Sequence, residues 1–135
     1  MTPIGLLRLI FSAIFITMLS VTVWASLQED IFKIPALVTG DPWFIASLFD
    51  AYFGFLTFYC WLFYKSSGFG ARLVWLVLIV LLGNTAMSAY MLWQLWRIPS
   101  NASVAQLLLR ADHWQRLQAA IQAPSKALDP STSYE

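Results

Sequence analysis

Residues 43–64 read WFIASLFDAYFGFLTFYCWLFY, and they contain one charged side chain, that of Asp50. A helix needs about 20 predominantly apolar residues to cross the hydrocarbon core of a bilayer. This stretch therefore predicts a membrane-spanning helix. Two further stretches, Pro3–Ala25 and Ala71–Trp96, have the same character, each with a single arginine near its start. We predict an all-α integral membrane protein, in which spans at about residues 3–25, 43–64 and 71–96 form a three-helix bundle within residues 1–98.

The composition of the whole chain supports this class. Of its 135 residues, 59% are hydrophobic and 11% are charged, whereas a soluble domain carries about 25% charged residues. So few charged side chains could not cover the surface of a water-soluble globule. The single cysteine, Cys60, excludes a disulfide framework, and its place in the second stretch is typical of a small apolar filler.

The ends of the second span carry clear signals. Asp41 can cap a helix, Pro42 suits the first helical position, and Trp43 suits the membrane interface. Residues 65–70, KSSGFG, predict the end of this span and a tight hairpin into the third. The first span has a competing interpretation, because Arg8 and the apolar run after it resemble a secretory signal. Since the apolar stretch extends on both sides of that run, we favour a span.

The basic residues of the short loops predict the orientation. Lys65 and Arg72 flank the predicted hairpin, whereas the loop at residues 26–42 holds three acids against one lysine. This places the N-terminus and the hairpin in the cytoplasm, and the first loop and the C-terminal segment outside. Three arginines after the third span favour the opposite side for that segment: Arg97, Arg110 and Arg116.

The residues after the third span differ in character. Apolar residues recur at helical spacing between Val104 and Trp114, and Ser103 has capping-box spacing to Gln106. We predict an amphipathic helix over residues 99–123 that lies on the membrane surface, on a partner, or on the protein's own loops. Residues 124–135 have the composition of a disordered tail.

Asp50 is the most informative residue of the sequence. It lies seven residues after Trp43, which is about 10 Å along a helix. An acid at that depth costs a few kcal/mol unless it is neutral, paired or hydrated, so we expect it to face the interior of the bundle. The same helical face carries small residues that favour close helix packing. The predicted packing residues are Ser47, Gly54, Thr57 and Gly83.

Matching the depths of the three spans predicts a polar centre around this acid. Its members are Asp50, Tyr52, Asn84, Ser88, Thr17 and Ser20. One hypothesis is that Asp50 binds a proton, a cation or a polar head group; the other is that it only bonds the helices together. His113 has no second histidine or cysteine at ligand spacing, so we predict no metal site. The seven tryptophans, five tyrosines and ten phenylalanines would suit a lipid, isoprenoid or pigment, but lipid-facing belts explain them better, and we predict no cofactor.

Three segments resemble, in order, a family of small bacterial and plant membrane proteins that is known only as a domain of unknown function. They are Val21–Ser26 (VTVWAS), Asp41–Tyr59 (with DPWF and FDAY) and Leu82–Met87 (LGNTAM). The likeness covers about Leu6 to Arg97, and the segment after Pro99 looks like an addition outside the family pattern. The resemblance implies about three spans and a shared polar centre around Asp50, Tyr52 and Asn84, but it supplies no activity.

No motif in the sequence specifies a reaction or a nucleic-acid interface. A membrane enzyme usually shows clustered acids or histidines, whereas the predicted spans hold one acid. We therefore predict a non-catalytic accessory or self-associating subunit of a membrane assembly, as a homo-oligomer or within a larger complex. The alternative is a small ligand-binding or proton-coupled carrier centred on Asp50.

Overall fold

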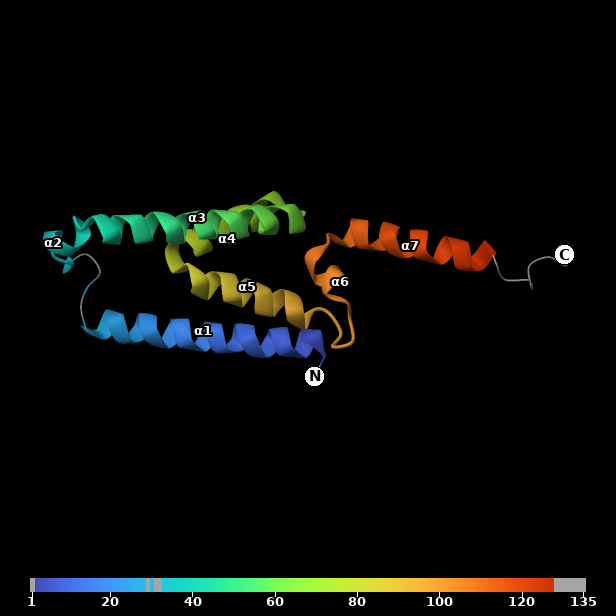
Figure 1. The fold of residues 1–135 in the computed structure, drawn as a ribbon, viewed down its shortest axis with the longest axis horizontal. Coiled ribbons are helices and arrows are strands. Elements are labelled where there is room, and N and C mark those ends of the chain that lie inside the picture. Colours follow the sequence, from blue (N-terminus) through green and yellow to red (C-terminus); the bar gives the residue numbers. More distant parts are fainter. Residues whose placement is uncertain (1, 29, 31–32, 128–135) are drawn as a thin grey trace.

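Two long helices frame the molecule. The computed structural model describes residues 2–28, 30 and 33–127, and in it α1 (Pro3–Gln28) and α3 (Pro42–Lys65) run in opposite directions (Figure 1). At 1.5 Å per residue they are roughly 39 Å and 36 Å long, which exceeds the hydrocarbon thickness of about 30 Å. Both are long and apolar enough to cross a membrane. The first two predicted spans are confirmed as helices of this kind.

The predicted start of the second long helix is also correct. The Asp41 carboxylate accepts hydrogen bonds from the backbone N–H groups of Trp43 (2.8 Å) and Phe44 (3.2 Å), and Pro42 is the first helical residue. The short helix α2 (Ala36–Thr39) precedes this cap. These bonds satisfy two of the free donors that every helix leaves at its N-terminus.

The prediction of a third continuous span is wrong. Residues 69–96 form two helices, α4 (Phe69–Leu82) and α5 (Asn84–Trp96), with Gly83 between them. Gly83 has φ 53° and ψ −127°, a conformation that essentially only glycine adopts. Its backbone N–H donates to Ile79 and its carbonyl accepts from Met87, so it ends one helix and begins the next. The chain reverses there, and α5 returns to the end at which α4 begins (Figure 1).

The two arms of this helical hairpin are short. They contain 14 and 13 residues, so each is about 20 Å long and neither reaches across a hydrocarbon core of about 30 Å. Apolar helices of this length are typical of buried or re-entrant segments. The hairpin tip ends beside the middle of α3, because a Cβ added to Gly83 would lie 2.7 Å from the Phe55 ring.

The second arm of the hairpin forms the centre of the fold. α5 makes the most extensive contact of any helix pair with α1 and also packs on α4 and α3. Small residues at its start, such as Ala86 and Ser88, are buried and allow this close approach. Ile4 of α1 is fully buried against Leu95 of α5. This packing joins the N-terminal turn of α1 to the end of α5.

The C-terminal segment differs from its prediction in two ways. Instead of one amphipathic helix it forms α6 (Val104–Leu108) and α7 (Ala111–Ala127). Ser103 does cap α6, since its hydroxyl accepts from the N–H of Ala105 at 3.2 Å. Residues 124–127, predicted as disordered, belong to the last turn of α7, because the missing N–H of Pro124 removes one backbone bond without ending the helix. The rest of the predicted tail, residues 128–135, lies outside the described residues.

Candidate functional site

The structure does not assemble the predicted polar centre. Asp50 is exposed on α3, and no hydrogen bond or ion pair joins it to the described part of the chain. Tyr52, Asn84, Thr17 and Ser20 are exposed as well. Ser88 is buried, but its hydroxyl donates within its own helix, to the carbonyls of Asn84 (2.7 Å) and Thr85 (3.0 Å). The expectation that Asp50 faces the interior of its own bundle is wrong.

The short hairpin explains this error. Gly83, at the hairpin tip, packs on Phe55. Compared with Phe55, Asp50 lies five residues nearer the start of α3, which is about 7 Å along the helix. The hairpin therefore ends close to this level and leaves Asp50 exposed. The prediction assumed a third span of full depth, which would have covered this position.

The predicted packing face of α3 is likewise uncovered within the chain. The hydroxyls of Ser47 and Thr57 donate to the carbonyls of their own helix, at 2.8 Å and 2.9 Å. A Cβ added to Gly54 would meet no atom within 4 Å. Of the four predicted packing residues, Gly83 alone makes a close contact with another helix of the described chain, through Phe55.

The polar contacts of the fold gather instead at one end of the molecule. The N-terminus of α1, the junction of α3 and α4, and the C-terminus of α5 meet there (Figure 1). We call this the basic end, because these four helix ends carry Arg8, Lys65, Arg72 and Arg97. Sequence reasoning missed it, since its contacts join residues that are far apart in the chain.

Arg8 joins the start of α1 to the end of α5. Its guanidinium donates to the carbonyls of Leu95 (2.8 Å and 3.3 Å) and Ile98 (2.7 Å) and to the hydroxyl of Ser100 (3.0 Å). The last carbonyls of a helix have no partner within the helix and carry a partial negative charge. Arg8 therefore caps α5 across the interface between the two helices.

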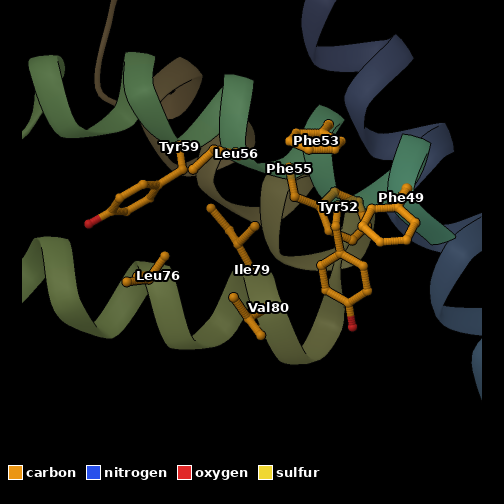
Figure 2. A pocket seen from close by; sticks show the side chains of 9 residues that line it. All are labelled: Phe49, Tyr52, Phe53, Phe55, Leu56, Tyr59, Leu76, Ile79 and Val80. Atoms are coloured by element: carbon orange, nitrogen blue, oxygen red, sulfur yellow. The ribbon is translucent and has the colours of Figure 1, made fainter.

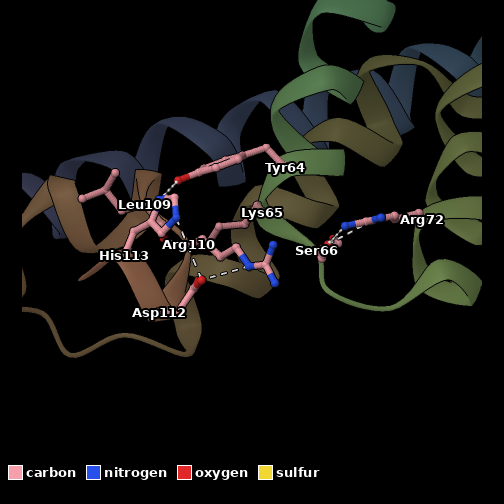
Figure 3. Close-up of polar contacts among 8 residues, drawn as sticks. All are labelled: Tyr64, Lys65, Ser66, Arg72, Leu109, Arg110, Asp112 and His113. Carbon is pink, nitrogen blue, oxygen red and sulfur yellow. Dashed lines mark hydrogen bonds and ion pairs between the residues drawn. The ribbon is translucent and has the colours of Figure 1, made fainter. Parts of the chain in front are cut away.

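Three side chains on the last turns of α3 hold the C-terminal segment. Trp61, Tyr64 and Lys65 share one face by their spacing. The indole N–H of Trp61 donates to the Leu108 carbonyl at 3.2 Å, and the Tyr64 hydroxyl lies 2.8 Å from Nδ1 of His113. The ammonium of Lys65 donates to three backbone carbonyls, those of Gln106, Leu107 and Leu109. Figure 3 shows the contact between Tyr64 and His113. These bonds fix the break between α6 and α7.

The junction of α3 and α4 is held by its own contacts. The guanidinium of Arg72 donates twice to the Ser66 carbonyl, at 2.7 Å and 2.9 Å (Figure 3). It also lies 4.0 Å from the centre of the Phe63 ring. At the start of α7, Arg110 pairs with Asp112 at 3.1 Å. Slight desolvation raises the pKa of the Asp112 carboxyl, but its backbone N–H and the charge of Arg110 lower that pKa by more.

Two cavities lie on the hairpin. The first, of about 320 Å³, opens between α3 and α4 and is lined by aromatic and aliphatic side chains, with Phe49 and Tyr52 near the hairpin tip (Figure 2). The second, of about 460 Å³, lies at the basic end and contains both polar and apolar groups. We call it the basic-end pocket. Its walls are the junction of α3 and α4, the end of α5, and the segment that joins α6 to α7.

A family model described as "Protein of unknown function (DUF1475)" matches residues 1–120. Neither the curated proteins nor the solved structures include a match to the chain. The family match extends well beyond Arg97 and includes α6 and much of α7, so the prediction that the segment after Pro99 lies outside the family pattern is wrong. Because residues 1–120 are far more than half of the chain, the protein belongs to the DUF1475 family.

Proposed function

We propose that the protein is a non-catalytic subunit of a membrane assembly. In this proposal α1 and α3 span the bilayer, and the α4–α5 hairpin enters from the basic end and returns to it. The lengths of the helices support this arrangement, because two exceed the hydrocarbon thickness and the arms of the hairpin do not. Irregular backbone at membrane depth is tolerated where protein covers it, and the Phe55 ring lies against Gly83.

The distribution of charge supports the same arrangement. In a two-span topology the N-terminus, the junction of α3 and α4, and the C-terminal segment all lie on one side. That side then holds Arg97, Arg110 and Arg116 together with the other arginines of the basic end. The opposite side holds the connector with Asp30, Lys33 and Asp41. The positive-inside rule therefore favours a cytoplasmic basic end. With three full spans, in contrast, Arg97, Arg110 and Arg116 would lie on the side opposite to Lys65 and Arg72.

Site-directed labelling tests this topology. In a Cys60→Ser background, a membrane-impermeant maleimide is expected to label Thr2→Cys and Ala123→Cys from the same side and Thr39→Cys from the other. All three positions belong to the described chain, and all three are exposed. Detergent-solubilised protein is the control, in which all three cysteines should react. Labelling of Ala123→Cys from the side of Thr39→Cys would show three full spans and exclude the hairpin.

The exposure of Asp50 is the main observation that supports a role in a membrane assembly. On a spanning helix, an uncovered acid in the hydrocarbon region costs about 2.5–3.5 kcal/mol on insertion scales. The described chain offers it neither a cation nor a hydrogen-bond donor, and α3 exposes large apolar residues such as Phe49 and Phe53 on both sides of it. A neighbouring subunit that covers this face and donates to the carboxyl removes that cost.

Native mass spectrometry in a mild detergent tests the role of Asp50 in assembly. We expect the wild type to be recovered as a complex whose mass identifies it as a homo-oligomer or a hetero-complex. Asp50→Leu, which removes the charge and the hydrogen bond, is expected to weaken that complex about tenfold or more, in line with the loss of roughly 1.5–3 kcal/mol for a charged hydrogen bond. Asp50→Asn retains hydrogen bonding and should weaken it less.

Thr17→Leu is the matched control, because it removes an exposed polar group from the other long helix. It is expected to leave the complex intact. A monomeric wild type, or a complex that Asp50→Leu weakens no more than Thr17→Leu does, would contradict the proposal. The carrier alternative has less support, because the polar residues predicted to surround Asp50 are not gathered at it within the described chain.

A further inference from the structure

We propose that the basic-end pocket binds the phosphate head group of an anionic phospholipid. The inference uses the membrane placement of the proposed function, in which the basic end lies at the bilayer surface. It does not depend on assembly through Asp50, which lies in the other half of α3. The cavity volume of about 460 Å³ falls within the usual range of small-ligand sites, about 300–1,000 Å³.

The charges of the pocket select for an anion. Lys65 and Arg97 both line it, and none of the described residues that line it is an aspartate or a glutamate. The ammonium of Lys65 is already bonded to three carbonyls, so it contributes a fixed positive charge and no free donor. Serine and glutamine side chains add neutral hydrogen-bonding groups to the same walls.

Arg97 provides the free donors. Its guanidinium lies 3.9 Å from the centre of the Trp93 ring, and it makes no hydrogen bond or ion pair with the described residues. A guanidinium that lies over an aromatic face keeps the N–H groups at its edge free, and these can form paired bonds to phosphate oxygens. In contrast, Arg8, Arg72 and Arg110 are each bonded within the protein.

The apolar part of the pocket favours a lipid over a soluble phosphate. Trp75 of α4 and Trp93 of α5 both line the pocket, and their ring centres are 6.0 Å apart. Tryptophan at this level is typical of the membrane interface. By helical spacing, the face of α4 that carries Ala71 and Trp75 continues along Leu78 and Leu82 towards the hairpin tip. This face offers an acyl chain an apolar path down from the head group.

Lipid titration followed by native mass spectrometry tests the inference on the full chain. Phosphatidylglycerol, phosphatidylcholine and inorganic phosphate are added separately to the protein in detergent. We expect one phosphatidylglycerol to bind with at least tenfold preference over phosphatidylcholine. Arg97→Gln should reduce that binding about tenfold, because it removes a charge-assisted bond. Arg97→Lys keeps the charge but not the planar fork. Its binding of phosphatidylglycerol should be weaker than that of the wild type and stronger than that of Arg97→Gln.

Arg116→Gln is the matched control, because Arg116 is exposed on α7 and does not line the pocket. Melting temperatures equal to that of the wild type would show that the Arg97 variants remain folded. Binding of inorganic phosphate as strong as that of the lipid would identify a soluble anion site and overturn the lipid assignment. Equal binding of both lipids, or equal effects of Arg97→Gln and Arg116→Gln, would overturn the site itself. The same spectra report the oligomeric state, so a failure of the assembly proposal is seen separately.

Discussion

Gly83→Ala is expected to lower the free energy of unfolding by about 2–6 kcal/mol, because two separate costs act at this position. The backbone conformation, φ 53° and ψ −127°, is strained for any residue with a Cβ, at about 1–3 kcal/mol. The added methyl group would also lie 2.7 Å from the Phe55 ring, and overpacking of this kind costs about 1–3 kcal/mol. Thermal unfolding in detergent measures the loss.

The same substitution is expected to change the topology of the protein. Without the reversal at Gly83, residues 69–96 have the length and composition of one continuous span. Part of the population should then expose Ala123→Cys on the side of the membrane where Thr39→Cys is labelled. Gly70→Ala is the control, because a Cβ there meets no atom within 4 Å and the position lies in the first turn of α4. If both variants have wild-type stability and sidedness, Gly83 does not determine the hairpin.

Arg8→Gln is expected to cost about 2–4 kcal/mol, because it breaks a charged contact with the end of α5 and leaves partly buried carbonyls without a donor. The carbonyls of Leu95 and Ile98 receive three bonds from this one guanidinium, and α1 and α5 form the main helix interface. Amide hydrogen exchange in the last turn of α5 is expected to rise, together with a lower melting temperature.

Two comparison variants sharpen this result. Arg8→Lys keeps the charge, but a single ammonium cannot replace the planar fork that reaches Leu95, Ile98 and Ser100 together, so its loss should be intermediate. Arg116→Gln removes an exposed arginine from α7 and should leave exchange in α5 unchanged. If Arg8→Gln melts like Arg116→Gln, the guanidinium does not hold the two helices together.

The parts of the fold that depend on local signals were predictable from the sequence. Asp41 and Pro42 mark the start of α3, and uninterrupted apolar stretches mark α1 and α3, because caps and hydropathy act within a few residues. The reversal at Gly83 was not predicted, since hydropathy measures composition and contains no information about φ. One signal did point to it: Arg97, Arg110 and Arg116 contradicted the orientation that three full spans require.

The candidate site was predicted less well than the fold, for a geometric reason. The burial of Asp50 and its meeting with Asn84 both depended on a third span of full depth, so one wrong helix removed the whole predicted centre. The contacts of the basic end could not be foreseen, because they join distant positions such as Arg8 and Leu95, or Tyr64 and His113. Neither residue of either pair indicates its partner by its local sequence.

The half-depth hairpin also gives the molecule a tapered shape. The half that contains the basic end includes α4 and α5, whereas these two helices do not extend along the start of α3 (Figure 1). In a bilayer, such a wedge takes up more area in one leaflet than in the other. Many copies side by side would therefore bend the membrane away from the wider leaflet, and the protein would concentrate where that curvature already exists.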